Sequence, residues 1–118
     1  MIVPHEAGPV TYVLPKPPTL SSCFRNSRDR GRVKTVRYHT WARAAGNEIT
    51  AQGRRKFFGR VSLTMTVPYR SNADLDNYWK ATKDLLKDMQ VIVDDSMRYC
   101  VRETAEIGEQ FTITVTPV

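Results

Sequence analysis

Four aspartates of the chain stand at spacings that suit metal chemistry. Asp74 and Asp76 are one residue apart, and the adjacent pair Asp94 and Asp95 follows after an amphipathic stretch. Carboxylates held close together repel one another unless a cation compensates their charge. Hard carboxylate oxygens are also the ligands that magnesium and manganese prefer. The pattern indicates a candidate Mg²⁺ or Mn²⁺ site built from Asp74, Asp76 and Asp95, with Asp94 as a further candidate ligand.

Each of these residues also has a plainer interpretation. Asp76 and Lys80 have the i,i+4 spacing of an ordinary exposed ion pair, worth a few tenths of a kcal/mol. Adjacent aspartates such as Asp94 and Asp95 are typical of a turn. Spacing alone leaves both interpretations open. A calcium-binding EF-hand is excluded, because Tyr78 and Trp79 occupy positions where that loop needs a ligand and a glycine.

The stretch between the acidic pairs predicts a helix. Seven residues recur at helical spacing and form one apolar stripe: Leu75, Tyr78, Trp79, Thr82, Leu85, Leu86 and Met89. Ser71 and Asp74 resemble a capping box at its start. We expect Asp74 on the extended chain and Asp76 in the first turn. Asp95 can reach them only if the chain doubles back over about 20 Å or the helix ends early.

The segment DLDNYWKATKDLLKDMQVIVDD resembles the RusA family of Holliday-junction resolvases. The shared pattern is D-L-D-N, a lysine four residues after the second aspartate, and an apolar tail that leads into D-D. The resemblance implies that Asp74, Asp76 and Asp95 are metal-binding catalytic carboxylates and that Lys80 is a catalytic lysine. The stretch VTYVLPKPPT resembles the opening strand and Pro-Pro turn of the family, so the likeness covers most of the chain.

Two departures from the family pattern concern DNA contacts rather than metal chemistry. The chain has Leu20-Ser21-Ser22-Cys23 where the family often has Asn-rich sequence. It also offers only Arg70 where a member of the family has a basic run before D-L-D-N.

The resemblance implies a Mg²⁺-dependent, structure-specific endodeoxyribonuclease. Such an enzyme would resolve four-way DNA junctions by paired phosphodiester hydrolysis, acting as a homodimer. A nuclease that acts on flaps or forks is an alternative with the same chemistry. A non-catalytic module that binds branched or single-stranded DNA is an alternative of another class. Charge does not separate the three, because all of them need a basic surface.

The charge is divided along the chain. Residues 1–73 hold 13 Lys/Arg and 3 Asp/Glu (net +10), and residues 74–118 hold 5 Lys/Arg and 9 Asp/Glu (net −4), which sum to +6. Such asymmetry predicts a polyanionic partner, and nucleic acid is favoured over a membrane because no basic segment has a large apolar face. The candidate DNA-binding residues are Arg25, Arg28, Arg30, Arg32, Lys34, Arg54, Arg55, Lys56, Arg70 and Lys83.

Periodicity predicts the fold class. Strands are expected at 10–14, 57–67, 97–104 and 110–116, the last two as a hairpin, with a second helix at 38–52. Residues 19–34 are interpreted as a loop that either contacts phosphate or is simply solvated. Trp41 is interpreted as core rather than as a base-stacking residue. The order β-α-β-α-β-β predicts a single α+β domain over residues 1–118, with a RusA-like mixed sheet and two main helices.

Composition excludes several other classes. No apolar run approaches the roughly 18 residues of a membrane span. The first residues lack the apolar core of a signal peptide, so a cytoplasmic protein is expected. Cys23, Cys100, His5 and His39 show neither zinc-ligand spacing nor a disulfide framework.

Overall fold

The computed structural model describes residues 8–70 and 73–118, so Ser71 of the expected capping box lies outside the described residues. The elements follow in the order β1 (Val10–Val13), α1 (Leu20–Cys23), β2 (Phe24–Ser27), β3 (Gly31–Lys34), α2 (Val36–Gln52), β4 (Val61–Pro68), the 3₁₀ helix η2 (Leu75–Tyr78), α3 (Trp79–Asp88), β5 (Cys100–Gly108) and β6 (Thr112–Pro117). The chain combines helices with a mixed sheet, which confirms the α+β class.

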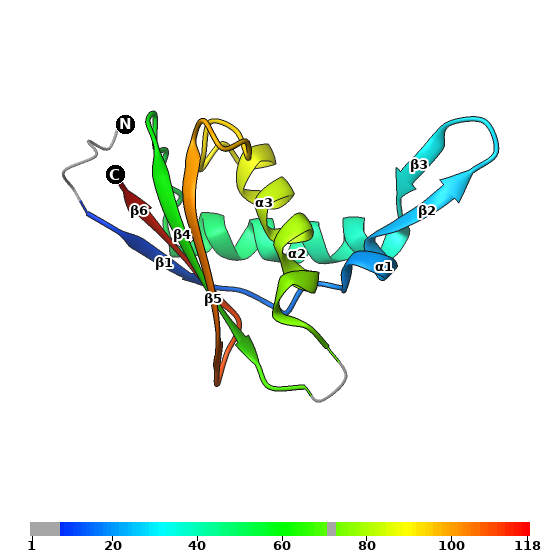
Figure 1. Ribbon diagram of the computed structural model, residues 1–118, viewed down its shortest axis with the longest axis horizontal. Coiled ribbons are helices and arrows are strands. Elements are labelled where there is room, and N and C mark those ends of the chain that lie inside the picture. The colour runs from blue at the N-terminus through cyan, green and yellow to red at the C-terminus, as the bar shows by residue number, and fades with distance from the viewer. Residues whose placement is uncertain (1–7, 71–72) are drawn as a thin grey trace.

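Four strands form the main sheet in the order β1-β6-β4-β5. β4 and β5 are parallel, whereas β6 is antiparallel to both β4 and β1. Figure 1 shows α2 and α3 on the same side of this sheet. The predicted hairpin of the last two strands is wrong, because β4 lies between β5 and β6. The apolar residues that alternate along β4 are fully covered, as suits a central strand: Val61, Leu63, Met65 and Val67.

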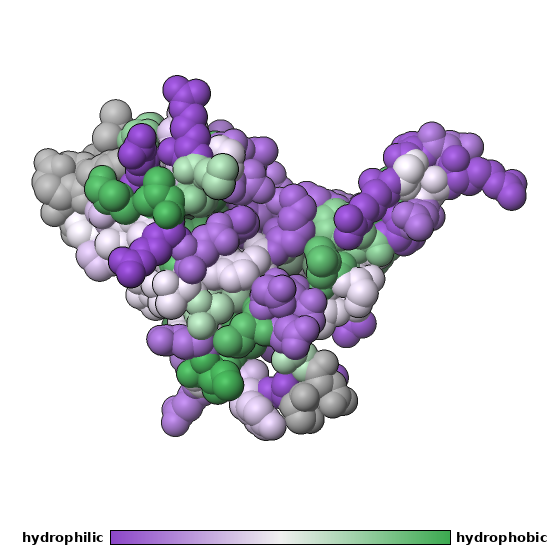
Figure 2. All heavy atoms as spheres, in the orientation of Figure 1, coloured by the Kyte–Doolittle hydropathy of each residue, from purple (hydrophilic) through white to green (hydrophobic). Residues whose placement is uncertain are grey.

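The predicted loop at 19–34 is also wrong, because it folds into the short helix α1 and a hairpin. β2 pairs with β3 from Phe24↔Lys34 to Ser27↔Gly31, and Gly31 has a positive φ of 68° that favours glycine. This hairpin projects away from the sheet and both long helices (Figure 1). Its surface in Figure 2 is mostly hydrophilic. We call residues 24–34 the hairpin arm.

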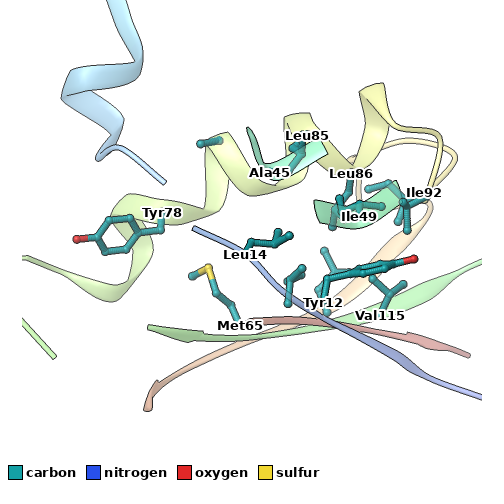
Figure 3. Packing of buried hydrophobic residues seen from close by; sticks show 14 of the residues in the cluster. Tyr12, Leu14, Ala45, Ile49, Met65, Tyr78, Leu85, Leu86, Ile92 and Val115 are labelled. Carbon is teal, nitrogen blue, oxygen red and sulfur yellow. The ribbon is translucent and has the colours of Figure 1, made fainter. Parts of the chain in front are cut away.

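The core lies between the helices and one face of the sheet. Figure 3 shows Tyr12, Met65 and Val115 of the sheet facing Ile49 of α2 and Leu86 of α3. Trp41 belongs to this core as expected, since it is 7% exposed and its Nε1 donates to Pro15 O at 2.7 Å.

Helix α2 begins and ends at residues that suit its two ends. Thr35 caps α2, because its Oγ1 accepts a hydrogen bond from Tyr38 N at 3.2 Å. The helix ends at Gln52, followed by Gly53 with φ 100°. Gly46 allows close packing of the helices, because a Cβ at this position would lie 3.2 Å from Met89 Sδ. Among the described residues, no helix is long and apolar enough to cross a membrane.

The other face of the sheet carries a row of threonines. Thr11, Thr114, Thr64 and Thr104 stand in register on β1, β6, β4 and β5. The hydroxyl groups of Thr11 and Thr114 are hydrogen-bonded at 2.8 Å. Cross-strand threonine pairs stabilise a sheet face that has no covering layer.

Candidate functional site

Asp74 and Asp76 lie where the chain passes from β4 into helix. Asp74 is extended (φ −87°, ψ 145°) and precedes η2, whereas Asp76 belongs to the first turn of η2. Both side chains are exposed. Asn77 N donates to Asp74 O at 3.1 Å, which fixes the start of the turn. The expected arrangement, with Asp74 on the extended chain and Asp76 in the first turn, is confirmed.

The chain doubles back after α3. The helix ends at Asp88, and Gln90 has a φ of 59°, in the left-handed region that reverses the backbone. Val91 N then donates to Leu86 O at 2.9 Å, and Val91 and Ile92 are buried. These contacts pack the returning segment against the helix that it has just left.

This return brings Asp95 beside Lys80. The two side chains lie 4.0 Å apart, measured from Lys80 Nζ to Asp95 Oδ2. Lys80 stands one helical turn after Asp76, which corresponds to a rise of about 6 Å. The return therefore brings Asp95 back along α3 as far as the reach of the Lys80 side chain, whose Nζ also lies beside Asp84 one turn further along the helix.

Asp84 is a functional candidate that sequence reasoning missed. Its side chain is buried, and its Oδ1 lies 3.1 Å from Lys80 Nζ while its Oδ2 lies 3.6 Å from Lys34 Nζ. Asp76 is not paired with Lys80 among the described residues, so the ordinary i,i+4 pair is formed by Lys80 with Asp84 instead. A charged residue whose helical position falls beside the apolar stripe is the signal that could have revealed it.

Asp94 and Asp95 contact two different lysines. Lys87 Nζ lies 3.2 Å from Asp94 Oδ1. The hydrogen bond from Lys87 holds the pKa of Asp94 below its ordinary value, and the same bond raises the pKa of Lys87. The adjacent carboxylates therefore face lysines that stand two helical turns apart on α3.

The donor types at this site suit Mg²⁺ or Mn²⁺, since Asp74, Asp76 and Asp95 offer hard, solvent-accessible carboxylate oxygens. Within residues 8–70 and 73–118, the structure brings no three His, Cys, Asp or Glu side chains close enough to hold one ion. What it does bring together is Asp95 with Lys80, and Lys80 with Asp84.

The predicted DNA-binding residues fall into two groups. The first lies on the hairpin arm, where Arg25, Arg28, Arg30 and Arg32 are exposed. The Arg32 guanidinium lies over the Phe24 ring at 4.3 Å, and Lys34 at the base of the arm faces Asp84. Exposed arginines on a projecting element can contact a phosphate backbone without rearrangement of the core.

The second group lies on the body of the domain, and several members already have partners there. Arg54 donates to Met89 O at 2.9 Å, Arg55 donates to Gly8 O at 2.8 Å, and Lys83 lies 2.8 Å from Glu103 Oε2. Lys56 is half-buried and Arg70 is exposed. Arg54, Arg55 and Lys83 thus hold parts of the fold together, whatever contact they make with DNA.

Comparison of the chain with family models and with curated proteins found no match in either case. The likeness to RusA resolvases therefore stays a prediction from the sequence. Function has to be argued from the positions of these side chains.

Proposed function

We propose that this chain is a Mg²⁺- or Mn²⁺-dependent endodeoxyribonuclease that resolves four-way DNA junctions. The observation that carries the proposal is the 4.0 Å approach of Asp95 to Lys80. It brings the far end of the motif to the helix turn that follows Asp76. Under this proposal, Asp95 and Lys80 act together with Asp74 and Asp76, which precede Lys80 by six and four residues in the chain.

In the proposed reaction, Asp74, Asp76 and Asp95 would hold the divalent ion, which requires them to come closer together than they lie in the described chain. When bound, the ion lowers the pKa of a water molecule and neutralises charge that gathers on the scissile phosphate. Lys80 donates hydrogen bonds to the phosphate or to its leaving oxygen. Asp84 keeps the Lys80 ammonium on this side of α3 before DNA binds, because it lies 3.1 Å away and is itself buried.

The hairpin arm is the proposed grip on the DNA backbone. The arm projects away from the sheet (Figure 1), and its exposed arginines can hold a duplex arm without competing with the ion for the carboxylates. A four-way junction has near two-fold symmetry, and paired cuts need two active sites. A C₂ homodimer with one site per subunit meets this need. Recognition by branch shape is favoured, because phosphate contacts carry no sequence information directly.

The deciding experiment is a cleavage gel with synthetic four-way, flap and duplex substrates, each with and without Mg²⁺. We expect Mg²⁺-dependent paired cuts in the four-way junction. Asp76→Asn should abolish cutting and leave junction binding in Ca²⁺ or EDTA largely intact. Asp88→Asn is the matched control, since Asp88 is an exposed residue at the far end of α3.

Other outcomes of the same cleavage assay would support one of the alternative functions. Preferential cutting of flaps would change the substrate that we assign but not the proposed reaction. Tight junction binding by the unaltered chain without any Mg²⁺- or Mn²⁺-dependent cutting would indicate the non-catalytic DNA-binding module. Unimpaired cutting by Asp76→Asn would remove Asp76 from the ligand set.

A further inference from the structure

A hollow of about 640 Å³ lies beside the candidate site, between the segment after β1, helix α2 and the chain before η2. This volume is in the range of small-ligand sites, about 300–1,000 Å³. Three cations line it, namely Lys16, Arg37 and Arg70. Neither Lys16 nor Arg37 belongs to the DNA-binding set expected from the sequence.

The charge of this hollow is uncompensated. Among the described residues, no carboxylate lines the hollow and none of its three cations forms an ion pair with a carboxylate. Four of the other lysines differ, since Lys34, Lys80, Lys83 and Lys87 have acidic partners. Converging cations in a concave site concentrate positive potential and favour an anion.

Polar and apolar groups complete the lining. Hydroxyl groups come from Thr19, Ser22 and Thr40, and apolar surface comes from Pro17, Pro18 and the edge of Trp41. Hydroxyls and cations together suit phosphate oxygens. Apolar walls beside them suit a sugar and a base rather than a small inorganic anion.

Tyr78 supplies an independent sign of a missing partner. Its side chain lines the hollow and is 1% exposed, and its Oη is buried without a hydrogen-bond partner in the described chain. Figure 3 shows its hydroxyl pointing away from the other labelled core residues. Buried hydroxyls are normally hydrogen-bonded. A ligand that entered the hollow and displaced the atoms that cover this hydroxyl would offer it an oxygen partner.

We propose that the hollow binds one nucleotide of single-stranded DNA, with its phosphate among the cations and its sugar and base against the apolar wall. A smaller hollow of about 150 Å³ is lined by Asp74 and shares Arg70, Ala73 and Tyr78 with the first. A strand that ran from the first hollow into the second would therefore pass Asp74. This role in guiding the cut strand rests on the proposed nuclease, whereas nucleotide binding itself needs no metal.

Tryptophan fluorescence can test the subsite in EDTA. The chain has two tryptophans, so in Trp79→Phe the remaining Trp41 reports on the hollow. Titration with thymidine 5′-monophosphate should give a saturable change, with weaker binding of thymidine and of inorganic phosphate. Arg37→Gln should weaken nucleotide binding about 10-fold, as loss of a charge-assisted phosphate contact implies. Arg43→Gln, an exposed change on the same helix outside the hollow, should leave it unaltered.

Calorimetric titration of the chain with both tryptophans in place gives a second measurement that does not depend on the reporter. The proposal is overturned by absent binding, by thymidine or inorganic phosphate binding as tightly as the nucleotide, or by equal effects of Arg37→Gln and Arg43→Gln. Failure of the nuclease looks different. If the chain binds the nucleotide through Arg37 but cuts no DNA, the nucleotide subsite is supported and the nuclease proposal fails. If the chain cuts DNA but does not bind the nucleotide, only the nuclease proposal is supported.

Discussion

Lys80 and Asp95 approach within 4.0 Å of each other, although most of α3 and its reversing turn separate them in the chain. The approach exists because α3 ends at Asp88 and the buried pair Val91 and Ile92 packs the return against it.

Lys80→Ala should lower the rate of junction cleavage about 100-fold or more, the scale expected when a charge that stabilises a transition state is lost. Junction affinity should change far less, since the proposed DNA contacts lie mainly on the hairpin arm. Single-turnover cleavage and gel-shift titration measure the two quantities separately. Lys87→Ala, two turns further along the same helix, is the control. Equal losses of rate and affinity in Lys80→Ala would make Lys80 an ordinary phosphate contact.

Asp84→Asn should lower the free energy of unfolding by about 1–3 kcal/mol, because it removes charge-assisted hydrogen bonding from a buried carboxylate. The loss should be smaller than for a fully buried pair, since the side chains of Lys34 and Lys80 are 31% and 48% exposed and regain water. Urea denaturation measures it, with Asp88→Asn as the control. An unchanged midpoint would show that Asp84 does not stabilise the fold.

Arg28→Gln combined with Arg30→Gln should weaken junction binding and flatten its salt dependence. Each phosphate contact contributes about 0.9 to the slope of log affinity against log salt for duplex DNA, so losing two contacts should reduce the slope by about 2. Binding isotherms at several salt concentrations give this slope. Arg98→Gln, on the body of the domain, tests whether the effect belongs to the arm. The same slope in the double variant would remove the arm from the DNA interface.

Tyr12→Phe should lower the free energy of unfolding by about 1–3 kcal/mol, whereas Tyr38→Phe should change it little or raise it. The Tyr12 hydroxyl donates to Gly53 O at 3.0 Å and accepts from Arg55 N at 2.9 Å, so its removal leaves two backbone groups without a partner. The Tyr38 hydroxyl is buried with no partner among the described residues. Thermal or urea unfolding compares the two variants, and a reversed order of their effects would contradict these assignments.

Alkaline pH should destabilise the fold through Cys100. Burial raises the pKa of this thiol from its ordinary value of 9.0 to about 11. The folded chain thus holds the proton more tightly than the unfolded chain. Its contribution to stability is complete below about pH 9 and is lost as the pH rises through about 11. Unfolding free energies measured from pH 8 to 11 should fall less steeply in Cys100→Ala, and identical profiles would show that the thiol has no such role.

Periodicity predicted the elements whose burial is decided locally. The stripe Tyr38, Trp41, Ala45 and Ile49 identified α2, and the alternation from Val61 to Val67 identified β4. The split between Asp74 and Asp76 followed in the same way, because Pro68 ends the strand before a helical pattern starts. In these segments the hydrophobic pattern of the sequence matches the burial of the same residues in the structure.

Strand order and long-range contacts were beyond such reasoning. β5 and β6 are joined by a short connection, yet each pairs with β4 rather than with the other. The polar composition of residues 24–34 hid a hairpin whose ladder is made of backbone groups. Asp84 meets Lys34 only once this hairpin and α3 are placed, and the hollow around Arg37 exists only after α2 docks.

The hairpin arm is attached to the domain at a single end, and Lys34 and Asp84 meet at that end. A force on the tip of the arm, such as that from a bent DNA duplex, would be transmitted to the base of the arm beside Asp84. The carboxylate at this base is the same one that holds Lys80. Under the proposed function, a pull on the arm and the position of Lys80 would be coupled through Asp84, the side chain that contacts both Lys34 and Lys80.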